Sequence, residues 1–511
     1  MRLGIDLGTT RTLVAACDRG NYPVLAFTNA GGDAYDYVPS ITAEKDGRLV
    51  HGFDAEEAAL GKAPHLRSCK RLLGRHGPEH RVSIGSVEVS LLELVTDYLR
   101  ALRLAILERS NVPREGLDGV FEAVVSVPAN AHSSQRWATL EAFRRAGFDV
   151  LRLINEPSAA GIEFAHRHPN ALNSRREHVA VYDLGGGTFD AALVCLGGAR
   201  HEVVATAGVQ ELGGDDFDRV LAELALEKAA VVLAPSDAGW GALLVECRAV
   251  KETIGASTRR LTVDLSSLGE LAPAEPISLQ VTDYFERLRP WIDRSLEALA
   301  SVLGAASQSS LDLENAAAEA GVAGLYIVGG ASALPLVARQ LRERFGRRVH
   351  RSPHPAGAIA MGLAIAADAD EVTAVRERFT RHLGVFREAE SGQNKVFDRI
   401  FSSGTPMPGM GDGPLIALRT YRAAHNVGQL RFVECGDVTE QREPTGDITP
   451  HATIHFPYAK SVRHAALEGL AIERLASDGP RIEERYEVDA AGVVVVTIRD
   501  LDDGFARAFT L

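Results

Sequence analysis

One glycine-rich stretch limits most strongly what this chain can fold into. Residues 179–190 read Val-Ala-Val-Tyr-Asp-Leu-Gly-Gly-Gly-Thr-Phe-Asp, an apolar run that reaches Asp183 and then passes through three successive glycines. Glycine has no Cβ, so backbone N–H groups of such a turn can close directly on an anionic ligand. The apolar residues on either side predict two buried strands. We therefore expect a strand–turn–strand unit, with Asp183 directed at whatever the turn binds.

The chain opens with almost the same unit. Residues 3–10 read Leu-Gly-Ile-Asp-Leu-Gly-Thr-Thr, and residues 12–17 again form a strand-like apolar run. Two strand–Asp-Leu-Gly–strand hairpins in one chain predict a duplicated lobe. Two lobes that face each other would hold a phosphate chain between their turns, with Asp6 and Asp183 near its metal ion.

Length and composition set broad limits. The chain has 511 residues, of which 46% are hydrophobic and 24% charged. This length is typical of about three domains, or of a large two-lobed domain with a smaller one. No stretch approaches the roughly 20 uninterrupted apolar residues of a membrane span. The first strand begins at Arg2, so we expect no signal peptide either.

Cysteine usage and charge narrow the possible partners. The five cysteines form no Cys-x-x-Cys pair, so we expect neither a disulfide framework nor a zinc site, and a reducing cytoplasm fits. The formal net charge of −13 repels polyanions. We therefore expect no nucleic acid and no membrane among the main partners.

The two glycine motifs resemble the phosphate motifs of the seventy-kilodalton heat-shock chaperones (DnaK-type). Asp-Leu-Gly alone is common at strand ends, and the eight-residue motif at 183–190 is much more specific. The resemblance implies an α/β actin-like ATPase fold, with two duplicated lobes around a nucleotide cleft and a C-terminal antiparallel β-sandwich domain. It also implies ATP or ADP and Mg²⁺ as cofactors.

Two further segments strengthen the resemblance. Residues 68–75, Ser-Cys-Lys-Arg-Leu-Leu-Gly-Arg, are similar to a family segment whose lysine reaches the γ-phosphate, which is Lys70 here. Taken alone, a lysine in a basic run is more typical of a solvated surface. Residues 155–160, Asn-Glu-Pro-Ser-Ala-Ala, resemble a family segment that places Glu156 near the metal and the attacking water. Without the resemblance, Glu156 would be a carboxylate in the first turn of a helix.

The resemblance assigns site residues one by one. It implies catalytic roles for Lys70, Glu156, Asp183 and Thr188, and metal binding by Asp6 and Asp183. Nucleotide contacts are implied for glycines, threonines and a lysine of the two lobes, which are Gly8, Thr9, Thr10, Gly185, Gly186, Gly187, Gly213, Gly214, Lys251, Gly329 and Gly330.

The nucleoside side departs from the family pattern. The family usually carries hydrogen-bonding side chains at positions occupied here by Gly255, Ala331, Ala333 and Ala356, and Arg248 replaces a glutamate. Each lost hydrogen bond removes about 1 kcal/mol. We therefore expect weakened adenosine binding, and discrimination between ATP and other purine triphosphates of under about tenfold.

The domain boundaries follow the same comparison. We expect a nucleotide-binding domain at 1–366, a linker at 367–382 and a β-rich substrate- or partner-binding domain at 383–511. The linker lacks the family's leucine-rich run and is charged. We therefore expect that it docks little on the nucleotide-binding domain and that the two domains are weakly coupled. The sequence reaches Leu511 just past the last predicted hairpin, so we expect a form without the family's helical lid.

These observations predict a DnaK-type, chaperone-like, Mg-dependent ATPase of weak activity. Its cleft would switch a lidless β domain that binds unfolded or extended polypeptide segments or a dedicated protein partner, and co-chaperones are further candidate partners. Two alternatives stay open: a non-hydrolysing scaffold, which the alanines on the nucleoside side favour, and a small-molecule kinase of the same superfamily.

Overall fold

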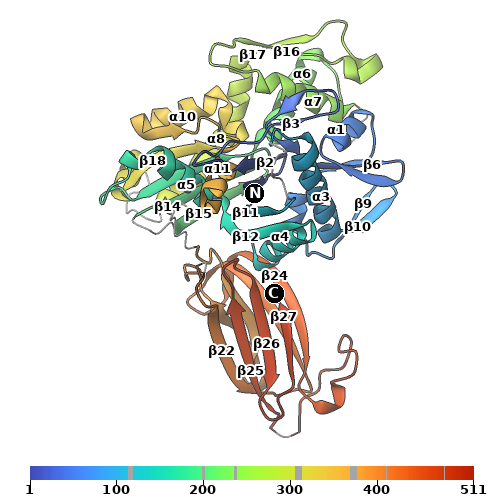
Figure 1. The fold of residues 1–511 in the computed structure, drawn as a ribbon, viewed down its shortest axis with the longest axis vertical. Helices are drawn as coiled ribbons and strands as arrows, with labels where there is room; N and C mark the ends of the chain where they lie inside the picture. The colour runs from blue at the N-terminus through green and yellow to red at the C-terminus, as the bar shows by residue number, and fades with distance from the viewer. Residues whose placement is uncertain are drawn as a thin grey trace.

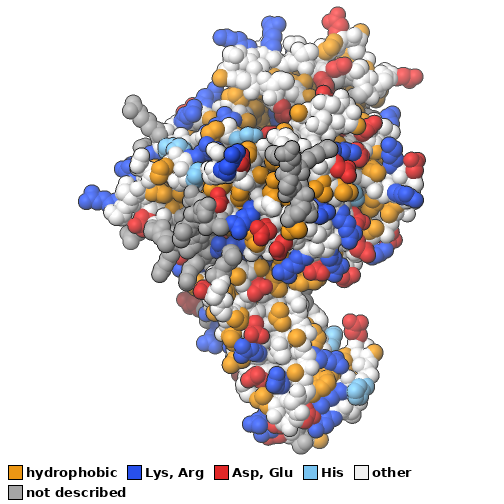
Figure 2. Space-filling view, in the orientation of Figure 1, with side chains coloured by type: hydrophobic (Ala, Val, Ile, Leu, Met, Phe, Trp, Pro, Cys, Tyr) orange, Lys and Arg blue, Asp and Glu red, His pale blue; other side chains and the backbone are white. Residues whose placement is uncertain are grey.

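The computed structural model describes residues 1–112, 119–197, 202–234, 239–304, 313–368, 377–409, 411–476 and 478–511. Figure 1 shows helices and mixed sheets in the upper part of the molecule and a separate body of strands below them. Figure 2 shows Lys and Arg side chains intermixed with Asp and Glu over the visible face. Within the described ranges, no helix combines the length and the apolar composition needed to cross a membrane.

The first lobe, lobe I, is built on a five-stranded sheet in the order β12-β11-β1-β2-β5. The chain-opening hairpin lies at its centre, where β1 pairs antiparallel with β2 and parallel with β11. The sheet strands are β1 (Arg2–Leu7), β2 (Arg11–Ala16), β5 (Val38–Pro39), β11 (Phe121–Val127) and β12 (Phe148–Asn155). Two helices, α3 (Leu91–Arg109) and α4 (Ser133–Arg145), share the apolar core of this lobe with the sheet.

Lobe II repeats this sheet strand for strand, in the order β15-β14-β13-β18-β19. The glycine-rich hairpin β13/β14 is central, and β13 pairs parallel with β18 as β1 does with β11. The strands are β13 (His178–Leu184), β14 (Thr188–Cys195), β15 (Glu202–Gln210), β18 (Val322–Val328) and β19 (Val349–Arg351). The predicted duplication is therefore present, because both hairpins occupy the same place in matching sheets.

The two lobes are joined through a common apolar core. Helices α5 (Glu156–Arg167) and α11 (Ala358–Ala367) lie in it together with residues of β2, β12, β13 and β18. The approach of the two helices is close, since a Cβ on Gly362 would lie 1.9 Å from the carbonyl oxygen of Ala159. Glycine is therefore required at this crossing, which holds the lobes in a fixed relation behind the cleft.

Further helices and strands complete the lobes. Lobe I adds β3 (Phe27–Thr28), β4 (Ala34–Tyr35), β6 (Ile41–Lys45), β7 (Arg48–His51), α1 (Phe53–Leu60), β8 (His65–Arg67), α2 (Cys69–Leu73), β9 (Arg81–Ile84) and β10 (Val87–Ser90). Lobe II adds α6 (Gly214–Ala229), α7 (Trp240–Glu252), β16 (Arg260–Val263), β17 (Ile277–Gln280), α8 (Val281–Gly304), α9 (Leu313–Glu319) and α10 (Pro335–Phe345).

The C-terminal domain consists of two four-stranded sheets, β21-β20-β23-β24 and β22-β25-β26-β27. Their residues alternate between buried and exposed, as in β26, and the buried set forms one core between the sheets. The strands are β20 (His382–Ala389), β21 (Asn394–Phe401), β22 (Leu415–Arg422), β23 (Val427–Val438), β24 (Pro444–Pro457), β25 (Arg481–Val488), β26 (Val494–Asp500) and β27 (Ala506–Thr510). The predicted antiparallel sandwich is present.

A charged network lies inside this sandwich. The carboxylate of Glu484 is fully buried and accepts two hydrogen bonds from the guanidinium of Arg387, at 2.6 and 3.1 Å. It also accepts the hydroxyls of Tyr421 and Tyr486, each at 2.5 Å. Arg387 also donates to Asp398 of β21, the neighbouring strand of its own sheet, at 2.6 Å. A buried charge is tolerated only when it is fully paired in this way.

The expected linker falls partly outside the described residues. Helix α11 ends at Ala367 and β20 begins at His382, and residues 369–376 lie outside the described ranges. The part that follows them is docked: the carboxylate of Glu377 accepts hydrogen bonds from the backbone N–H of Asn155 at 2.9 Å and from its side-chain amide at 2.5 Å. The charged linker was expected to dock little on the nucleotide-binding domain. This expectation is wrong at Glu377, because polar contacts hold this residue where apolar ones are missing.

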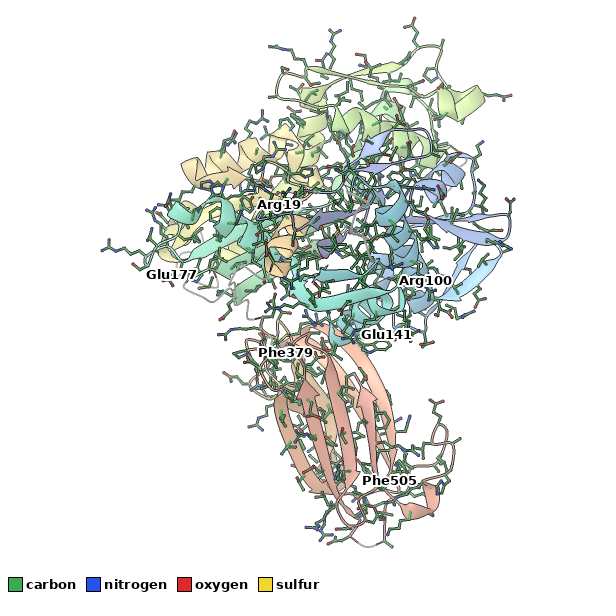
Figure 3. All side chains as sticks on the ribbon, viewed as in Figure 1. Arg19, Arg100, Glu141, Glu177, Phe379 and Phe505 are labelled. Atoms are coloured by element: carbon green, nitrogen blue, oxygen red, sulfur yellow. The ribbon has the colours of Figure 1, made fainter. Side chains whose placement is uncertain are left out.

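The sandwich itself also contacts lobe I. Glu434 of β23 accepts a hydrogen bond from the backbone N–H of Ser133 at 2.9 Å, at the start of α4. Arg136 on the same helix donates to the carbonyl oxygen of Ala491 at 3.1 and 3.2 Å, in the turn between β25 and β26. Figure 3 shows Phe379 at this junction and Phe505 at the opposite end of the sandwich.

The buried network generates a stability prediction. We expect Glu484→Gln to lower the free energy of unfolding of the sandwich by about 3 kcal/mol, because it leaves Arg387 without a buried carboxylate partner. The matched control is Glu487→Gln on the same strand, whose partner Arg485 is 40% exposed, and we expect under about 1 kcal/mol there. Urea unfolding followed by near-UV circular dichroism measures both. Equal losses would contradict a special role for the buried network.

Candidate functional site

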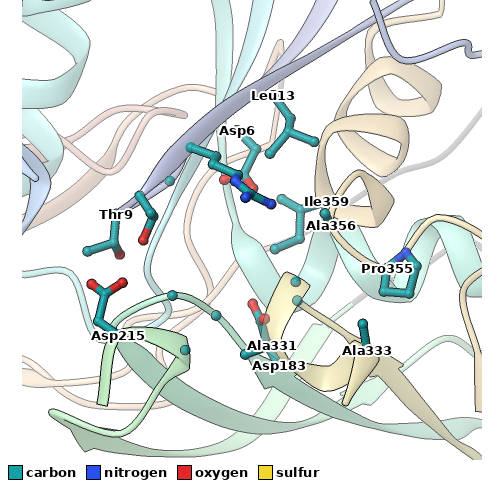
Figure 4. A pocket seen from close by; sticks show the side chains of 18 of the residues that line it. Asp6, Thr9, Leu13, Asp183, Asp215, Ala331, Ala333, Pro355, Ala356 and Ile359 are labelled. Carbon is teal, nitrogen blue, oxygen red and sulfur yellow. The ribbon is translucent and has the colours of Figure 1, made fainter. Parts of the chain in front are cut away.

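A cavity of about 450 Å³ lies between the two central hairpins. Figure 4 shows Asp6 and Thr9 of lobe I and Asp183 and Asp215 of lobe II around it. Most residues predicted from the sequence line it: Asp6, Gly8, Thr9, Thr10, Lys70, Glu156, Asp183, Gly185, Gly186, Thr188, Gly214, Lys251, Gly329 and Gly330. The structure therefore gathers residues between Asp6 and Gly330 of the chain at one site.

Two predicted residues, Gly187 and Gly213, are not among the residues that line the cavity and lie directly behind its wall. Backbone bonds tie the glycine turn to the start of α6, from Gly214 N–H to Gly185 O at 3.0 Å and from Asp215 N–H to Gly186 O at 2.7 Å. A Cβ on Gly213 would lie 2.6 Å from the backbone nitrogen of Gly187. The two glycine segments can interlock because Gly213 lacks a side chain that would meet the glycine turn.

One hydroxyl in this cradle lacks a partner. The Oγ1 atom of Thr10 is buried and has no hydrogen-bond partner among the described residues. A Cβ on Gly186 would lie 1.9 Å from this atom, so the turn of lobe II closes against the turn of lobe I here. A buried hydroxyl without a partner is costly, and a phosphate oxygen in the cradle would satisfy it. The site therefore fits a phosphate group.

Local structure fixes Lys70 in the cleft. It is the second residue of α2, whose N-cap Ser68 has φ of 64° and accepts the backbone N–H of Arg71 at 3.3 Å. A positive φ is uncommon for serine, and this left-handed cap turns the short helix toward the cleft. Lys70 forms a hydrogen-bonded ion pair with Glu156, the first residue of α5. The surface interpretation of Lys70 is thus wrong, since its side chain is 13% exposed.

Three aspartates surround this ion pair. Asp190 lies directly opposite Asp183 in the β13/β14 ladder, so the two side chains are neighbours. Burial, together with the charge of Glu156, raises the pKa of Asp190 to about 7 and that of Asp183 well above its ordinary value. Burial also raises the pKa of Asp6, which accepts the Ser126 hydroxyl at 2.7 Å, to about 6.

The charge on Lys70 balances this group. Burial opposes protonation of its amine, but the charges of Glu156 and Asp6 outweigh it and raise the pKa of Lys70. The sequence assigned no role to Asp190, although it closes the eight-residue motif. The antiparallel register of the hairpin is the signal that could have identified it.

The donor set suits magnesium bound with a phosphate. Among the described residues, no three His, Cys, Asp or Glu side chains gather to hold a metal ion alone. Mg²⁺ commonly takes one or two carboxylates and completes its shell with water and substrate phosphates. Asp6 and Asp183, on facing hairpins, fit this pattern.

Lys251 is engaged within lobe II. Its amine donates to Gly214 O at 2.7 Å and pairs with Asp218 at 2.5 Å. Arg248 pairs with Asp215 and Asp218 at 2.8 and 3.1 Å. Both cations therefore hold the start of α6, and a direct nucleotide contact of Lys251 stays a prediction.

Ion pairs that the sequence did not predict cross the cleft. Arg11 pairs with Glu252 at 2.6 Å, Arg71 with Asp215 at 3.5 Å, Arg75 with Glu211 at 3.5 Å, and Asp36 with His354 at 3.0 Å. In each pair one residue belongs to lobe I and the other to lobe II. The two residues of a pair are up to 318 positions apart, so no local sequence pattern indicates these pairs.

The interlocked glycines generate a binding prediction. Gly213 has an extended backbone that any residue adopts, so Gly213→Ala acts only through its contact with Gly187. We expect that displacement to weaken binding of Mg²⁺ with ATP at least about tenfold. Gly241→Ala, whose Cβ meets no atom within 4 Å, is the control. Calorimetric titration showing equal affinities for both variants would contradict this account of the cradle.

The Asp36–His354 pair generates a pH prediction. Its hydrogen bond raises the pKa of His354 and lowers that of Asp36. Its stabilisation is thus complete below the ordinary histidine pKa of about 6.5 and is lost as pH rises through the raised value. At low pH it is lost as Asp36 protonates. We expect Asp36→Asn to lower the free energy of unfolding of the lobes, followed by thermal unfolding, most between about pH 5 and 6, by under about 1 kcal/mol. A difference that stays constant from pH 5 to 9 would contradict the pairing.

Comparison with known proteins agrees with this geometry. Residues 2–377 match the family described as Hsp70 protein. A chaperone protein HscA homolog of Burkholderia pseudomallei (strain 668) is 34% identical over 389 residues, which cover 72% of this chain and 58% of that protein. The chaperone protein HscA of Serratia proteamaculans (strain 568) is 34% identical over 388 residues, covering 71% of this chain and 57% of that protein. The chain thus matches less than two thirds of the length of these relatives, and it belongs to the Hsp70 family.

Proposed function

We propose that this chain is a chaperone-type ATPase that binds Mg²⁺ with ATP between its lobes and hydrolyses it. The observation that carries the proposal is the meeting of both Asp-Leu-Gly hairpins around the buried Lys70–Glu156 pair. Thr9, Thr10 and the glycine turn offer hydroxyl and N–H donors to a phosphate chain. Bound Mg²⁺ would supply charge neutralisation at the phosphates.

Each residue of the cleft would have its own role in ATP hydrolysis. Lys70 would stabilise the charge that develops on the transferred phosphoryl group. Glu156 and Asp183 would orient the attacking water, and Thr188, beside the glycine turn, would donate to a phosphate oxygen. Asp190, with its pKa raised to about 7, is suited to accept a proton near neutral pH. Because such chemistry depends on positioning, small displacements of these groups reduce the rate steeply.

The β domain is proposed to bind polypeptide and to be coupled to the cleft. Asn155 precedes Glu156 directly, donates to Glu377, and accepts a hydrogen bond from Arg136 at 2.9 Å. Arg136 in turn contacts the turn between β25 and β26. A change at Glu156 on nucleotide binding would therefore shift both the join and the sandwich, which revises the expectation of weak coupling.

A non-hydrolysing scaffold is the second candidate. The small side chains of Ala331, Ala333 and Ala356 along the cavity favour it, because they provide no side-chain hydrogen bonds to a nucleoside. Steady-state phosphate release separates the two candidates. The complete Lys70–Glu156 pair favours hydrolysis.

The first test concerns chemistry. We expect Lys70→Ala to lower the rate of phosphate release at least about 10²-fold while nucleotide still binds, because the variant loses a charge partner of the transition state. Lys228→Ala, which removes an exposed lysine of lobe II, is the control and should keep the wild-type rate. Unchanged turnover in Lys70→Ala would show that Lys70 does not act in the reaction.

The second test concerns coupling. In the wild type, we expect release of a labelled apolar peptide to differ by more than about threefold between ATP and ADP, a ratio that requires differential affinity for two states. Glu377→Gln should bring this ratio close to one, because it loses the charged acceptor for Asn155, while phosphate release changes by less than about twofold. Glu440→Gln, at an exposed site of the same domain, is the control. Stopped-flow release with the same ratio in Glu377→Gln would contradict coupling through this contact.

A further inference from the structure

One end of the cavity is mainly apolar. Figure 4 shows Ala333, Pro355, Ala356 and Ile359 grouped on one side, away from Thr9 and Asp215. With the phosphate cradle at the other end, a nucleoside would occupy this apolar region. The polar side chains that line the cavity include Arg11, Asp36, Glu252 and His354.

Arg11 is held in a fixed place at this end. It is the first residue of β2, directly after the Thr9–Thr10 turn. Its guanidinium lies 4.3 Å from the centre of the Tyr37 ring and 2.6 Å from the carboxylate of Glu252, the last residue of α7. The side chain of Arg11 is 27% exposed, so it lies in the wall of the cavity rather than in bulk solvent.

The guanidinium of Arg11 is accessible from the cavity, which Arg11 lines. A planar guanidinium stacks on aromatic faces, and one face here is turned to Tyr37. The opposite face can therefore receive a second flat group, such as a nucleobase. Glu252 has two carboxylate oxygens, each able to accept more than one hydrogen bond, so it can accept from a ligand amino group while it binds Arg11.

We propose that Arg11 and Glu252 form the base-binding element of this cleft, with Arg11 stacking on a purine and Glu252 selecting an exocyclic amino group. This inference rests on the proposed nucleotide binding. It also revises the expectation of poor base selectivity, because the pair supplies polar groups where Ala331, Ala333 and Ala356 supply none. Since Arg11 belongs to lobe I and Glu252 to lobe II, a bound base would contact both lobes at once.

The test compares three ligands with Mg²⁺ by calorimetric titration. ATP and inosine triphosphate differ at the exocyclic amino group, which is replaced by a carbonyl oxygen, and at the neighbouring ring nitrogen, which then carries a proton. Inorganic triphosphate has no nucleoside. We expect the wild type to bind ATP at least about tenfold more tightly than inosine triphosphate. Glu252→Gln should bring this ratio within about threefold, since an amide can donate to the carbonyl oxygen.

Arg11→Ala separates stacking from phosphate binding. We expect it to weaken ATP and inosine triphosphate alike by at least about tenfold and to leave inorganic triphosphate unchanged. The matched controls are Arg75→Ala and Glu211→Gln, which break another cross-lobe pair whose side chains are 58% and 72% exposed. Both should keep wild-type affinities.

Three results with the variants would overturn the inference alone. They are an ATP preference that survives in Glu252→Gln, an Arg11→Ala variant with unchanged ATP affinity, and a loss of inorganic triphosphate binding equal to the loss of ATP binding. A wild type that binds inorganic triphosphate but shows no preference for ATP also overturns it. A wild type that binds none of the three ligands overturns the proposed function together with the inference.

Discussion

The ion pair between Lys70 and Glu156 is the interaction on which the site depends. It lies among Asp6, Asp183 and Asp190, where Asp6 and Glu156 are buried and Lys70, Asp183 and Asp190 are partly buried. Burial disfavours the ionised form of each aspartate, and the charges of neighbouring carboxylates add to this effect, so the pKa values of the three aspartates are raised. The arrangement is therefore costly to maintain and is suited to a ligand that brings positive charge and hydrogen-bond acceptors together.

The fold supports this arrangement through symmetry. Matching sheets place one hairpin at the centre of each lobe, and the shared core of α5 and α11 holds the lobes behind them. Asn155, which directly precedes Glu156, is then connected to the β domain through its contacts with Arg136 and Glu377. In this chain, charged and polar contacts thus join lobe I to the β domain, where the charged linker was expected to dock little.

The sequence could predict what depends on local patterns. Strand ends, glycine turns and the order of the two hairpins are visible in residues 3–17 and 179–195, and the resemblance located Lys70 and Glu156. Pairs such as Arg11–Glu252 and Ser133–Glu434 could not be predicted, because they join residues 241 and 301 positions apart with no shared pattern. Asp190 was missed for another reason, since its role follows from the strand register and not from its position in the motif.

The central claim is that both lobes bind one phosphate chain at the same time. Hydrogen–deuterium exchange of the wild type, with and without Mg²⁺ and ATP, tests this claim most directly. The account predicts that the amides of residues 8–10 in lobe I and of residues 185–187 and 213–214 in lobe II become protected together, at the same nucleotide concentration. Protection of one lobe alone, or of neither, would contradict it.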